Sequence, residues 1–410
     1  MTTVIQLIDA QRHVWSHINV LPAVTLPLDA AVGCSLANDV IAAESVPPFA
    51  NSAVDGWAVR AGETAGAPVK LRVLGAIAAG EVADIDLEPG SAIKIMTGAP
   101  MPIGADAVVM VEDSVVDSTG ASVEILASVG AGQSIRSAGS DVREGQVVFR
   151  SGTAITPAVA GVLASINANF VTVTRKARIG VLSTGDELVD DGSPLAPGQI
   201  RESNKVMLLK LVAAAGAEPI DFGIIKDDEA ALETALRTAV DQCDAVLTSG
   251  GVSMGDYDVV KAVLSRIASM AWMQIAIRPA KPFAFGVLSN TSGVEVPIFG
   301  LPGNPVSSMV SFELIARPAI RQMMNLEPFR PTVLAIADDD MRREPDGKTH
   351  WNRVFAKFDE DGYVHVTSTG PQGSHQLAAT SIANALAMVE DGQGVYAGDR
   401  LEVMLLSDWS

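Results

Sequence analysis

The sequence predicts a multidomain α/β protein in which a doubly wound, mostly parallel sheet is accompanied by two β-rich regions. From Ala177 to about Leu326, short buried strands alternate with helices, which is the pattern of a parallel sheet with right-handed crossovers. Residues 46–175 and the residues after Leu326 instead form short Val/Ile/Ala-rich runs interrupted by Gly and Pro, which is typical of β-structure. The 410 residues are enough for about two to four domains.

The expected elements follow the chain in order. Residues 4–18 are predicted to form an opening helix because apolar side chains recur at helical spacing. The uncharged run Ser151–Thr174 contains Pro157 and several hydroxyl groups, so we interpret it as a short buried helix followed by a strand and not as a membrane span. The alternating region predicts strands over 179–183, 220–225, 245–248, 273–277 and 296–299, and helices from Ser203 or Asn204 to about Ala215, over 229–242 after an Asp228 cap, over 259–268 after an Asp258 cap, and after Pro305.

Composition excludes several classes of function. Hydrophobic residues make up 48 % of the chain, so it is not disordered. The net charge of −19 argues against a nucleic-acid backbone or an anionic membrane surface as the partner, although not against a small anionic ligand. Cys34 and Cys243 cannot form a disulfide framework, and no CxxC pair indicates zinc. The N-terminus has no basic signal-peptide region, so we expect a soluble cytoplasmic protein.

The carboxyl ends of the predicted parallel strands carry most of the candidate binding residues. Ligands bind beyond these ends in open parallel sheets, and Gly-rich turns that lead into helices offer N–H groups to phosphate. Carboxylates beside a phosphate site indicate Mg²⁺. Each acid alone is better explained as a helix cap, but four converging loops favour a binding cleft. The strand-end residues are Ser183, Thr184, Gly185, Asp186 and Glu187; Asp227 and Asp228; Gly250, Gly251, Ser253 and Asp258; and Pro302, Asn304 and Pro305.

Common nucleotide and metal motifs are absent from the sequence. There is no GxGxxG and no HExxH. Gly347-Lys348-Thr349 imitates the end of a Walker A loop, but Arg342 stands where its first glycine should be. His13 and His17 have the spacing of two metal ligands on a helix, but a packed or solvated helix face explains them better. The remaining histidines, His350, His365 and His375, receive no role.

Five longer strings combine turn-forming residues with single charged or hydroxyl side chains. PPFANSAVDGWAV contains Asp55, KIMTGAPMPIGADAVVMVED contains Thr97, and GSDVREG contains Asp141. IRPAKP places Arg278 and Lys281 three residues apart, and LPGNP follows one strand later. Taken singly, each has a structural explanation as a turn acid or a surface charge.

Together with STGDEL and SGGVS, these strings resemble the MoeA family, the molybdopterin molybdenumtransferases of molybdenum-cofactor biosynthesis, in family order to Leu406. The resemblance implies a homodimer whose cleft uses both subunits, and contacts with other cofactor-biosynthesis proteins. It also implies four domains: an elongated linking domain (1–45 with 142–175), a β-rich inserted domain (46–141), a molybdopterin-binding α/β domain (176–326) and a barrel-like C-terminal β-domain (327–410).

The resemblance further implies a transferase reaction with Mg²⁺ as cofactor. Molybdenum from molybdate is inserted into adenylylated molybdopterin, and AMP is released. The implied catalytic residues are Asp55, Thr97, Asp141, Glu187, Asp227 and Asp258, of which Glu187, Asp227 and Asp258 hold the metal. The implied substrate-binding residues are Ser183, Thr184, Gly185, Asp186, Gly250, Gly251, Ser253, Arg278, Lys281, Pro302, Asn304, Pro305, Ser307, Arg353 and Ser374.

The chain departs from the family pattern at three positions. Trp57 replaces a usual Tyr, Arg278 a usual Lys, and Ala280 a usual Gly. If that glycine has a positive φ, alanine there adopts an unfavourable backbone conformation. Two alternatives stay open: a molybdopterin adenylyltransferase that uses Mg·ATP, which would not need Asp55 or Thr97, and a non-catalytic scaffold of the same fold. The sequence does not distinguish molybdate from tungstate.

Overall fold

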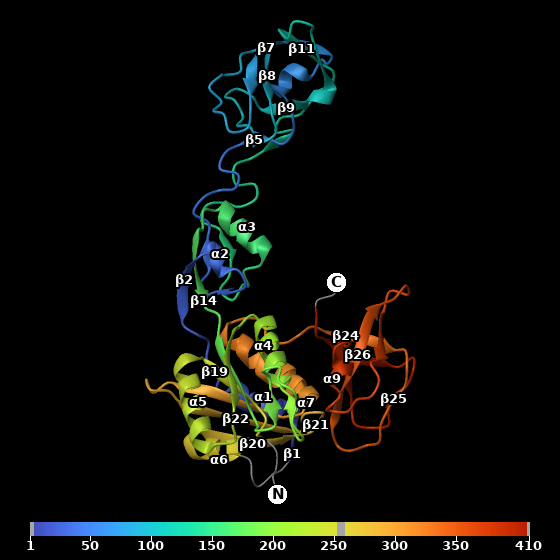
Figure 1. Ribbon diagram of the computed structural model, residues 1–410. Helices are drawn as coiled ribbons and strands as arrows, with labels where there is room; N and C mark the ends of the chain where they lie inside the picture. Colours follow the sequence, from blue (N-terminus) through green and yellow to red (C-terminus); the bar gives the residue numbers. More distant parts are fainter. Residues whose placement is uncertain (1–3, 252–258, 408–410) are drawn as a thin grey trace. The chain divides into compact units, whose positions relative to one another are not determined.

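The computed structural model describes residues 4–251 and 259–407 (Figure 1). Contacts within the chain define two compact units. The large unit comprises residues 1–24, 33–35 and 174–410, and the small unit comprises residues 25–32 and 36–173. The chain therefore passes between the units four times. The finer four-domain boundaries stay a prediction.

A seven-stranded sheet forms the centre of the large unit, in the order β1-β20-β22-β23-β19-β15-β18. β22 is antiparallel to both of its neighbours, whereas the other pairings are parallel. The predicted mostly parallel sheet is thus confirmed. Its strands are β1 (Val4–Ile5), β15 (Arg178–Thr184), β18 (Glu218–Ile225), β19 (Ala245–Ser249), β20 (Ser269–Ile275), β22 (Pro282–Ser289) and β23 (Glu295–Leu301), with a separate pair β16 (Leu188–Val189) and β17 (Ile200–Arg201).

Two strands of this sheet differ from the sequence prediction. β1 occupies residues for which apolar spacing predicts helix, because its backbone pairs with that of β20; helix α1 begins only at Leu7. β22 is absent from the predicted strands. Its apolar residues do not reveal that the chain turns back directly after β20, since strand direction is set by pairing and not by local pattern.

Helices cover both faces of the sheet, as a doubly wound fold requires. The adjacent residues Leu247 and Val246 of β19 point to opposite faces. Leu247 belongs to one buried cluster with Leu208 of α4, and Val246 to another with Leu236 of α5 and Val263 of α6. The helices are α1 (Leu7–Trp15), α4 (Asn204–Ala214), α5 (Glu229–Gln242), α6 (Val259–Ile267), α7 (Pro305–Ser311) and α8 (Arg317–Met323), with the π-helical segment η3 (Phe312–Ala316) between the last two.

The predicted helix caps have different outcomes. Asp228 caps α5 as expected, because its carboxylate accepts a 2.7 Å hydrogen bond from the Ala231 N–H. Ser203 occupies the N-cap position of α4, but its side chain makes no cap bond. Instead, Glu202 accepts the Lys205 N–H at 2.6 Å. The predicted cap Asp258 lies outside the described residues.

The C-terminal region confirms the predicted barrel-like β-domain. Five strands close on themselves because β26 pairs with both β27 and β28. β21, from the α/β part of the chain, pairs with β26 in parallel. The elements are β21 (Ile277–Arg278), β24 (Thr332–Ala337), β26 (Thr349–Phe358), β27 (Val364–Ser368), β28 (Ala385–Val389) and β30 (Arg400–Leu405), with the pair β25 (Met341–Arg342) and β29 (Gly394–Val395) and helix α9 (Leu377–Thr380).

The small unit is β-rich, as predicted, and is built around a six-stranded sheet in the order β10-β11-β7-β8-β6-β9. These strands are β6 (Gly56–Val59), β7 (Val69–Ile77), β8 (Ser91–Ile95), β9 (Ala107–Met110), β10 (Ser114–Val116) and β11 (Ser122–Ile125). Further elements of chain segment 23–174 are β2 (Ala23–Pro27), β3 (Ser35–Leu36) and β14 (Phe170–Thr174) in one sheet, the pairs β4 (Val40–Ile41) with β13 (Val147–Phe149) and β5 (Asn51–Ser52) with β12 (Ile135–Arg136), and helices α2 (Leu28–Ala31), α3 (Pro157–Ser165), η1 (Ala61–Thr64) and η2 (Val111–Asp113).

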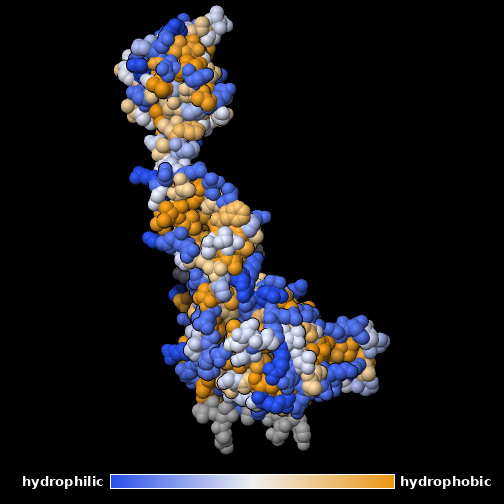
Figure 2. All heavy atoms as spheres, turned by 90° about the vertical axis from the view of Figure 1, so that its left-hand side faces the viewer, coloured by the Kyte–Doolittle hydropathy of each residue, from blue (hydrophilic) through white to orange (hydrophobic). Residues whose placement is uncertain are grey.

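The uncharged run forms helix α3 and then strand β14, as predicted, but the helix is not buried. Leu163 is its one fully buried residue. The Thr156 side chain caps α3 by accepting the Val159 N–H. Among the described residues, no helix combines the length and hydrophobicity needed to cross a membrane. The molecular face in Figure 2 carries hydrophilic and hydrophobic residues side by side. Phe170, the first residue of β14, is an exposed apolar side chain.

The Asp228 cap gives a prediction for the stability of α5. We expect Asp228→Ala to weaken the first turn by about 1 kcal/mol, because the Ala231 N–H loses its acceptor. That change corresponds to about fivefold faster amide exchange, measurable by hydrogen-exchange mass spectrometry on peptides spanning 228–242. Asp228→Asn retains an acceptor and serves as the control. Equal exchange in all three proteins would show that the cap contributes nothing.

Candidate active site

A cavity of about 820 Å³ lies at the carboxyl edge of the parallel strands of the large unit. Loops after β15, β18, β19 and β23 line it, which is the convergence expected from the strand ends. The structure brings together nine of the sequence-predicted residues there: Thr184, Gly185, Glu187, Asp227, Gly250, Gly251, Pro302, Asn304 and Pro305. The volume is within the range of ligand pockets, roughly 300–1,000 Å³.

Glycines allow these loops to approach one another. Gly185, Gly250 and Gly251 have φ values of +146°, +99° and +74°, which side chains disfavour. A Cβ atom on Gly185 would lie 2.5 Å from a carboxylate oxygen of Glu187, and one on Gly250 would lie 3.3 Å from the Thr184 hydroxyl. The Glu187 carboxylate therefore folds over the Gly185 backbone in space that only a glycine leaves.

Carboxylates in this cavity suit a divalent cation. Glu187 and Asp227 both line it, and Asp186 accepts a 3.3 Å hydrogen bond from the Asp227 N–H, which fixes the Asp227 loop. Mg²⁺ is typically held by one or two carboxylates together with substrate phosphates, so these residues fit that ion. The described part of the chain contains no preformed group of three metal-ligating side chains. Ser253 and Asp258, the other residues predicted after β19, lie outside the described residues.

Two buried polar residues near this cavity behave differently from the prediction. Ser183 is fully buried in β15 and does not line the cavity. Asn204, expected only as a helix cap, does line it. The Asn204 amide nitrogen donates to the Ser249 hydroxyl at 2.8 Å and to the Gly303 carbonyl at 2.7 Å, so it joins the loops after β19 and β23.

A second cavity of about 410 Å³ adjoins the first. Pro282, Asn304 and His375 line both cavities and form a shared wall. Besides Asn304, four sequence-predicted residues line the second cavity: Arg278, Lys281, Ser307 and Ser374. Two cations and two hydroxyl groups suit a small oxyanion, because ionised donors make strong hydrogen bonds to anionic oxygens. We call this the anion cavity.

The barrel contributes one side of the anion cavity. Parallel pairing of β21 with β26 sets Arg278 opposite His350 and Ile277 opposite Thr349. The Ser374 carbonyl accepts the Val306 N–H at 3.1 Å, which holds the loop 371–376 against the start of α7. Residues from the sheet and from the barrel thus meet because of backbone contacts and not by chance approach of side chains.

Arg353 is predicted to bind substrate, but it lines neither cavity. Its side chain is 1 % exposed, and its guanidinium donates to the carbonyls of Gln376 and Pro371, each at 2.8 Å. Burial lowers its pKa. In this structure Arg353 therefore positions the loop that carries Ser374 and His375.

The small unit contains the other predicted catalytic residues. Asp55 accepts hydrogen bonds from the Thr97 backbone at 2.7 Å and from the Thr97 hydroxyl at 2.8 Å, and these bonds lower the pKa of the Asp55 carboxyl. Asp141 lies in an exposed turn, and its N–H donates to the Val46 carbonyl at 3.0 Å. The structure thus brings Asp55 and Thr97 together.

Sequence reasoning missed several cavity residues, among them Asn204, Lys348 and His375. His375 directly follows Ser374, so the string that contains that serine could have indicated it. In the sequence, Lys348 stands out only because Gly347-Lys348-Thr349 imitates the end of a Walker A loop. Its place in the anion cavity depends on the pairing of β21 with β26, for which local sequence gives no signal.

The fold and the two cavities define an α/β protein with a ligand-sized cavity at the carboxyl edge of its sheet. Residues 5–167 match the MoeA N-terminal region (domain I and II), residues 180–322 a probable molybdopterin binding domain, and residues 335–406 the MoeA C-terminal region (domain IV).

Individual relatives agree over nearly the whole chain. It is 40 % identical to molybdopterin molybdenumtransferase 2 of Mycobacterium tuberculosis, covering 96 % of this chain and 98 % of that protein. It is 38 % identical to molybdopterin molybdenumtransferase of Haemophilus influenzae, covering 92 % of each chain. The crystal structure of the molybdopterin biosynthesis MoeA protein of Pyrococcus horikoshii OT3 superposes with a TM-score of 0.82 at 30 % identity, covering 98 % of this chain and 100 % of that one. The chain belongs to the MoeA family.

Ala280, which replaces a usual glycine of the family, has the unfavourable backbone conformation that the sequence analysis considered. This buried residue has φ +77°, a left-handed conformation that strains a side-chain-bearing residue. We expect Ala280→Gly to stabilise the protein by about 0.5–1 kcal/mol after the greater freedom of glycine in the unfolded chain is deducted. The thermal unfolding midpoint should then rise by about 2 °C.

Ala276→Gly is the matched control for Ala280→Gly. Ala276 is also buried, but its φ is not left-handed and its N–H donates to the Ile5 carbonyl. Glycine there should lower the midpoint. If Ala280→Gly lowers it as well, the strain at Ala280 is not relieved by removing Cβ.

Proposed function

We propose that the chain transfers molybdenum from molybdate to adenylylated molybdopterin, with release of AMP. Family membership supports this reaction, since the curated relatives carry the name molybdopterin molybdenumtransferase. The observation that carries the proposal is the shared wall of Pro282, Asn304 and His375, which joins a large cavity with carboxylates to an anion cavity with cations.

The large cavity suits the pterin and its phosphoanhydride. The Gly250 N–H already donates to the Leu301 carbonyl at 3.0 Å, so we assign the contact with a phosphate oxygen to the N–H of Gly251 in the same positive-φ turn. Glu187 and Asp227, with Asp258 as the third predicted ligand, would hold Mg²⁺ there. When bound, Mg²⁺ neutralises negative charge on the phosphates. Asn204 holds two of the loops in place.

The anion cavity suits molybdate. Arg278 and Lys281 balance the two negative charges of the anion, and the hydroxyl groups of Ser307 and Ser374 donate to its oxygens. Arg278 offers a planar fork of donors where the family usually has the point charge of lysine. The two thiol groups of molybdopterin bind molybdenum through their sulfurs, and their two protons leave with one oxide as one water, so molybdenum keeps its oxidation state. Water cleaves the phosphoanhydride to give AMP and the phosphate of the finished cofactor.

Asp55, Thr97 and Asp141 belong to the same proposal. We propose a homodimer in which these small-unit residues complete the cleft of the partner subunit, as the family resemblance implies. The hydrogen bonds from Thr97 keep the Asp55 carboxylate ionised and oriented, which suits a group that acts on a ligand. We also propose that the protein is soluble and located in the cytoplasm.

The proposed reaction predicts that the protein releases AMP from adenylylated molybdopterin with Mg²⁺ and without ATP. Molybdate should stimulate release, and tungstate in a parallel reaction tests the choice of oxyanion. Asp227→Asn should lower the rate on the order of 10²-fold, because a charge facing the phosphates is lost. Asp228→Asn is the control, since Asp228 caps α5 and does not line the cavity.

Other outcomes would identify the alternatives. Consumption of ATP with formation of adenylylated molybdopterin would indicate an adenylyltransferase. Binding without any AMP release would indicate a scaffold. Equal rates for Asp227→Asn and Asp228→Asn would contradict the placement of Asp227 in the phosphate site.

Mixed dimers can test whether Asp55 completes the cleft of the partner subunit. Asp55→Ala and Asp227→Ala homodimers should each be inactive, but mixed subunits should recover part of the activity, because one cleft of each heterodimer then contains both acids. AMP release after subunit exchange measures the recovery, and mass spectrometry of isotope-labelled subunits confirms exchange. Heterodimers without activity would show that Asp55 does not serve the partner's cleft.

A further inference from the structure

We propose that Lys348 is a third cation of the anion cavity and that Asp346 competes with the bound anion for its ammonium group. The identity of the anion as molybdate rests on the proposed function. The place of Lys348 beside Arg278 and Lys281 rests on the structure alone, since all three line the same cavity.

The backbone of Lys348 is fixed beside the cavity. The next residue, Thr349, begins β26, and its N–H donates to the Ala276 carbonyl at 2.9 Å. The Lys348 carbonyl accepts a 2.8 Å hydrogen bond from the guanidinium of Arg343, whose side chain is 4 % exposed. With both neighbouring peptide groups held, the four-carbon stem is the mobile part of Lys348.

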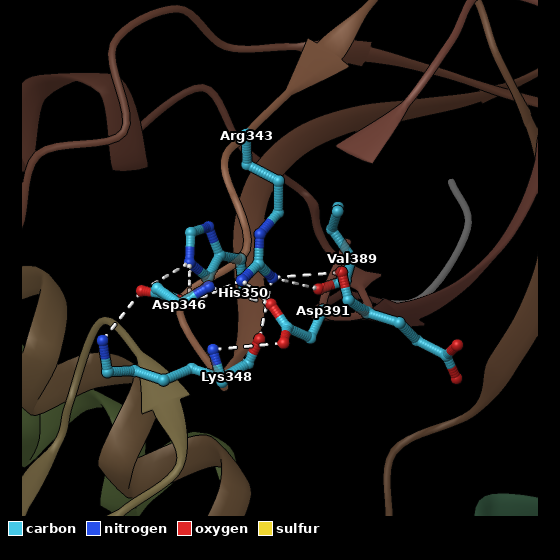
Figure 3. Close-up of polar contacts among 8 residues, drawn as sticks. Arg343, Asp346, Lys348, His350, Val389 and Asp391 are labelled. Atoms are coloured by element: carbon cyan, nitrogen blue, oxygen red, sulfur yellow. Dashed lines mark hydrogen bonds and ion pairs between the residues drawn. The ribbon is translucent and has the colours of Figure 1, made fainter. Parts of the chain in front are cut away.

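The Lys348 ammonium contacts Asp346 and has donors to spare (Figure 3). Its nitrogen lies 2.8 Å from one Asp346 carboxylate oxygen. An ammonium group has three N–H donors, and within the described residues Asp346 is its one recorded partner. The side chain is 25 % exposed and Lys348 lines the anion cavity, so its remaining donors are available to a ligand bound there. A tetrahedral oxyanion offers acceptors for such donors.

Asp346 can lose Lys348 without being left unpaired. Its carboxylate also accepts a 2.5 Å hydrogen bond from Arg343 and lies 3.3 Å from the His350 imidazole (Figure 3). Arg343 is held in turn by the carboxylate of Asp391 at 2.8 Å. The contact with Lys348 and the nearby His350 lower the Asp346 pKa to about 2, so the group is a carboxylate at neutral pH.

The charges around the cavity favour exchange of Lys348 between the two anions. Without a ligand, Arg343 and Lys348 balance Asp346 and Asp391, because burial lowers the pKa of His350 and keeps it neutral. A partly exposed ion pair between Lys348 and Asp346 contributes little stability. A dianion already held by two cations therefore competes effectively for the third.

Strand β26, which begins directly after Lys348, provides a matched control. Lys357 lies on β26, and it pairs with Asp359 at 2.9 Å two residues away, as Lys348 pairs with Asp346. Lys357 lines neither of the two cavities. Substitution of Lys357 removes a similar charge and a similar ion pair, but not a group that faces the anion.

The test measures binding of molybdate alone to the full chain by isothermal titration calorimetry at low salt. Lys348→Met should weaken binding by about fivefold, because one charge-assisted contact is lost, whereas Lys348→Arg and Lys357→Met should bind as the unchanged protein does. Asp346→Asn should tighten binding by about threefold, because the competing carboxylate is gone. A role limited to structure would not produce tighter binding.

Two further measurements test whether Asp346 acts through Lys348 and whether Lys348 contacts molybdate or a phosphate group. Combining Asp346→Asn with Lys348→Met should give the affinity of Lys348→Met alone, since both act through one ammonium group. AMP affinity should not change in Lys348→Met; a loss confined to AMP would place Lys348 at the phosphates and overturn the proposal.

Three outcomes of the molybdate titration would contradict the proposal. Equal molybdate binding by Lys348→Met and Lys357→Met would overturn the role of Lys348 while leaving the proposed reaction intact. Unchanged or weaker binding by Asp346→Asn would overturn the competition. If the unchanged protein binds no molybdate, both the anion cavity and the role of Lys348 fall together.

Discussion

The short parallel pairing of β21 with β26 is the contact on which the candidate site depends. It involves two residue pairs, Ile277 with Thr349 and Arg278 with His350. This pairing joins the segment between β20 and β22 of the α/β part to the longest strand of the barrel, and it brings cations from two separate chain regions into one cavity. The large cavity can be understood from the sheet alone, because strand ends converge in any doubly wound fold. The anion cavity exists only because the barrel is held against it.

Two buried arginines maintain this arrangement by satisfying loop carbonyls. Arg353 holds the loop 371–376, and Arg343 holds the segment that carries Lys348. Each supplies several donors to backbone oxygens that would otherwise be buried without partners, which is costly. The residues that face the cavities are therefore positioned by charged groups that do not face them. Some charged side chains in this region hold loops in place, and others line the cavities. Residue type alone does not distinguish these two roles.

Local features of the fold could be predicted from the sequence, whereas pairings between distant segments could not. Asp228 caps its helix as expected, and Glu187 and Asp227 meet at strand ends, because capping and strand alternation are local patterns. The reversed direction of β22 and the edge strand β1 depend on partners far along the chain. The same limit explains why Lys348 was missed. Arg353 shows a second limit, since an arginine beside a ligand and one beneath a loop look alike in sequence.

The fourfold passage of the chain between its two units has a consequence for how the units can be separated. Connections occur at residues 24–25, 32–33, 35–36 and 173–174. A protease that cuts one of them leaves the units covalently joined through the others. Excision of residues 36–173 as a single fragment would break two connections and leave residues 25–32 behind as a loop of the large unit. The small unit is thus built from two separate chain segments, and a chain cut at one connection would keep its two units linked covalently.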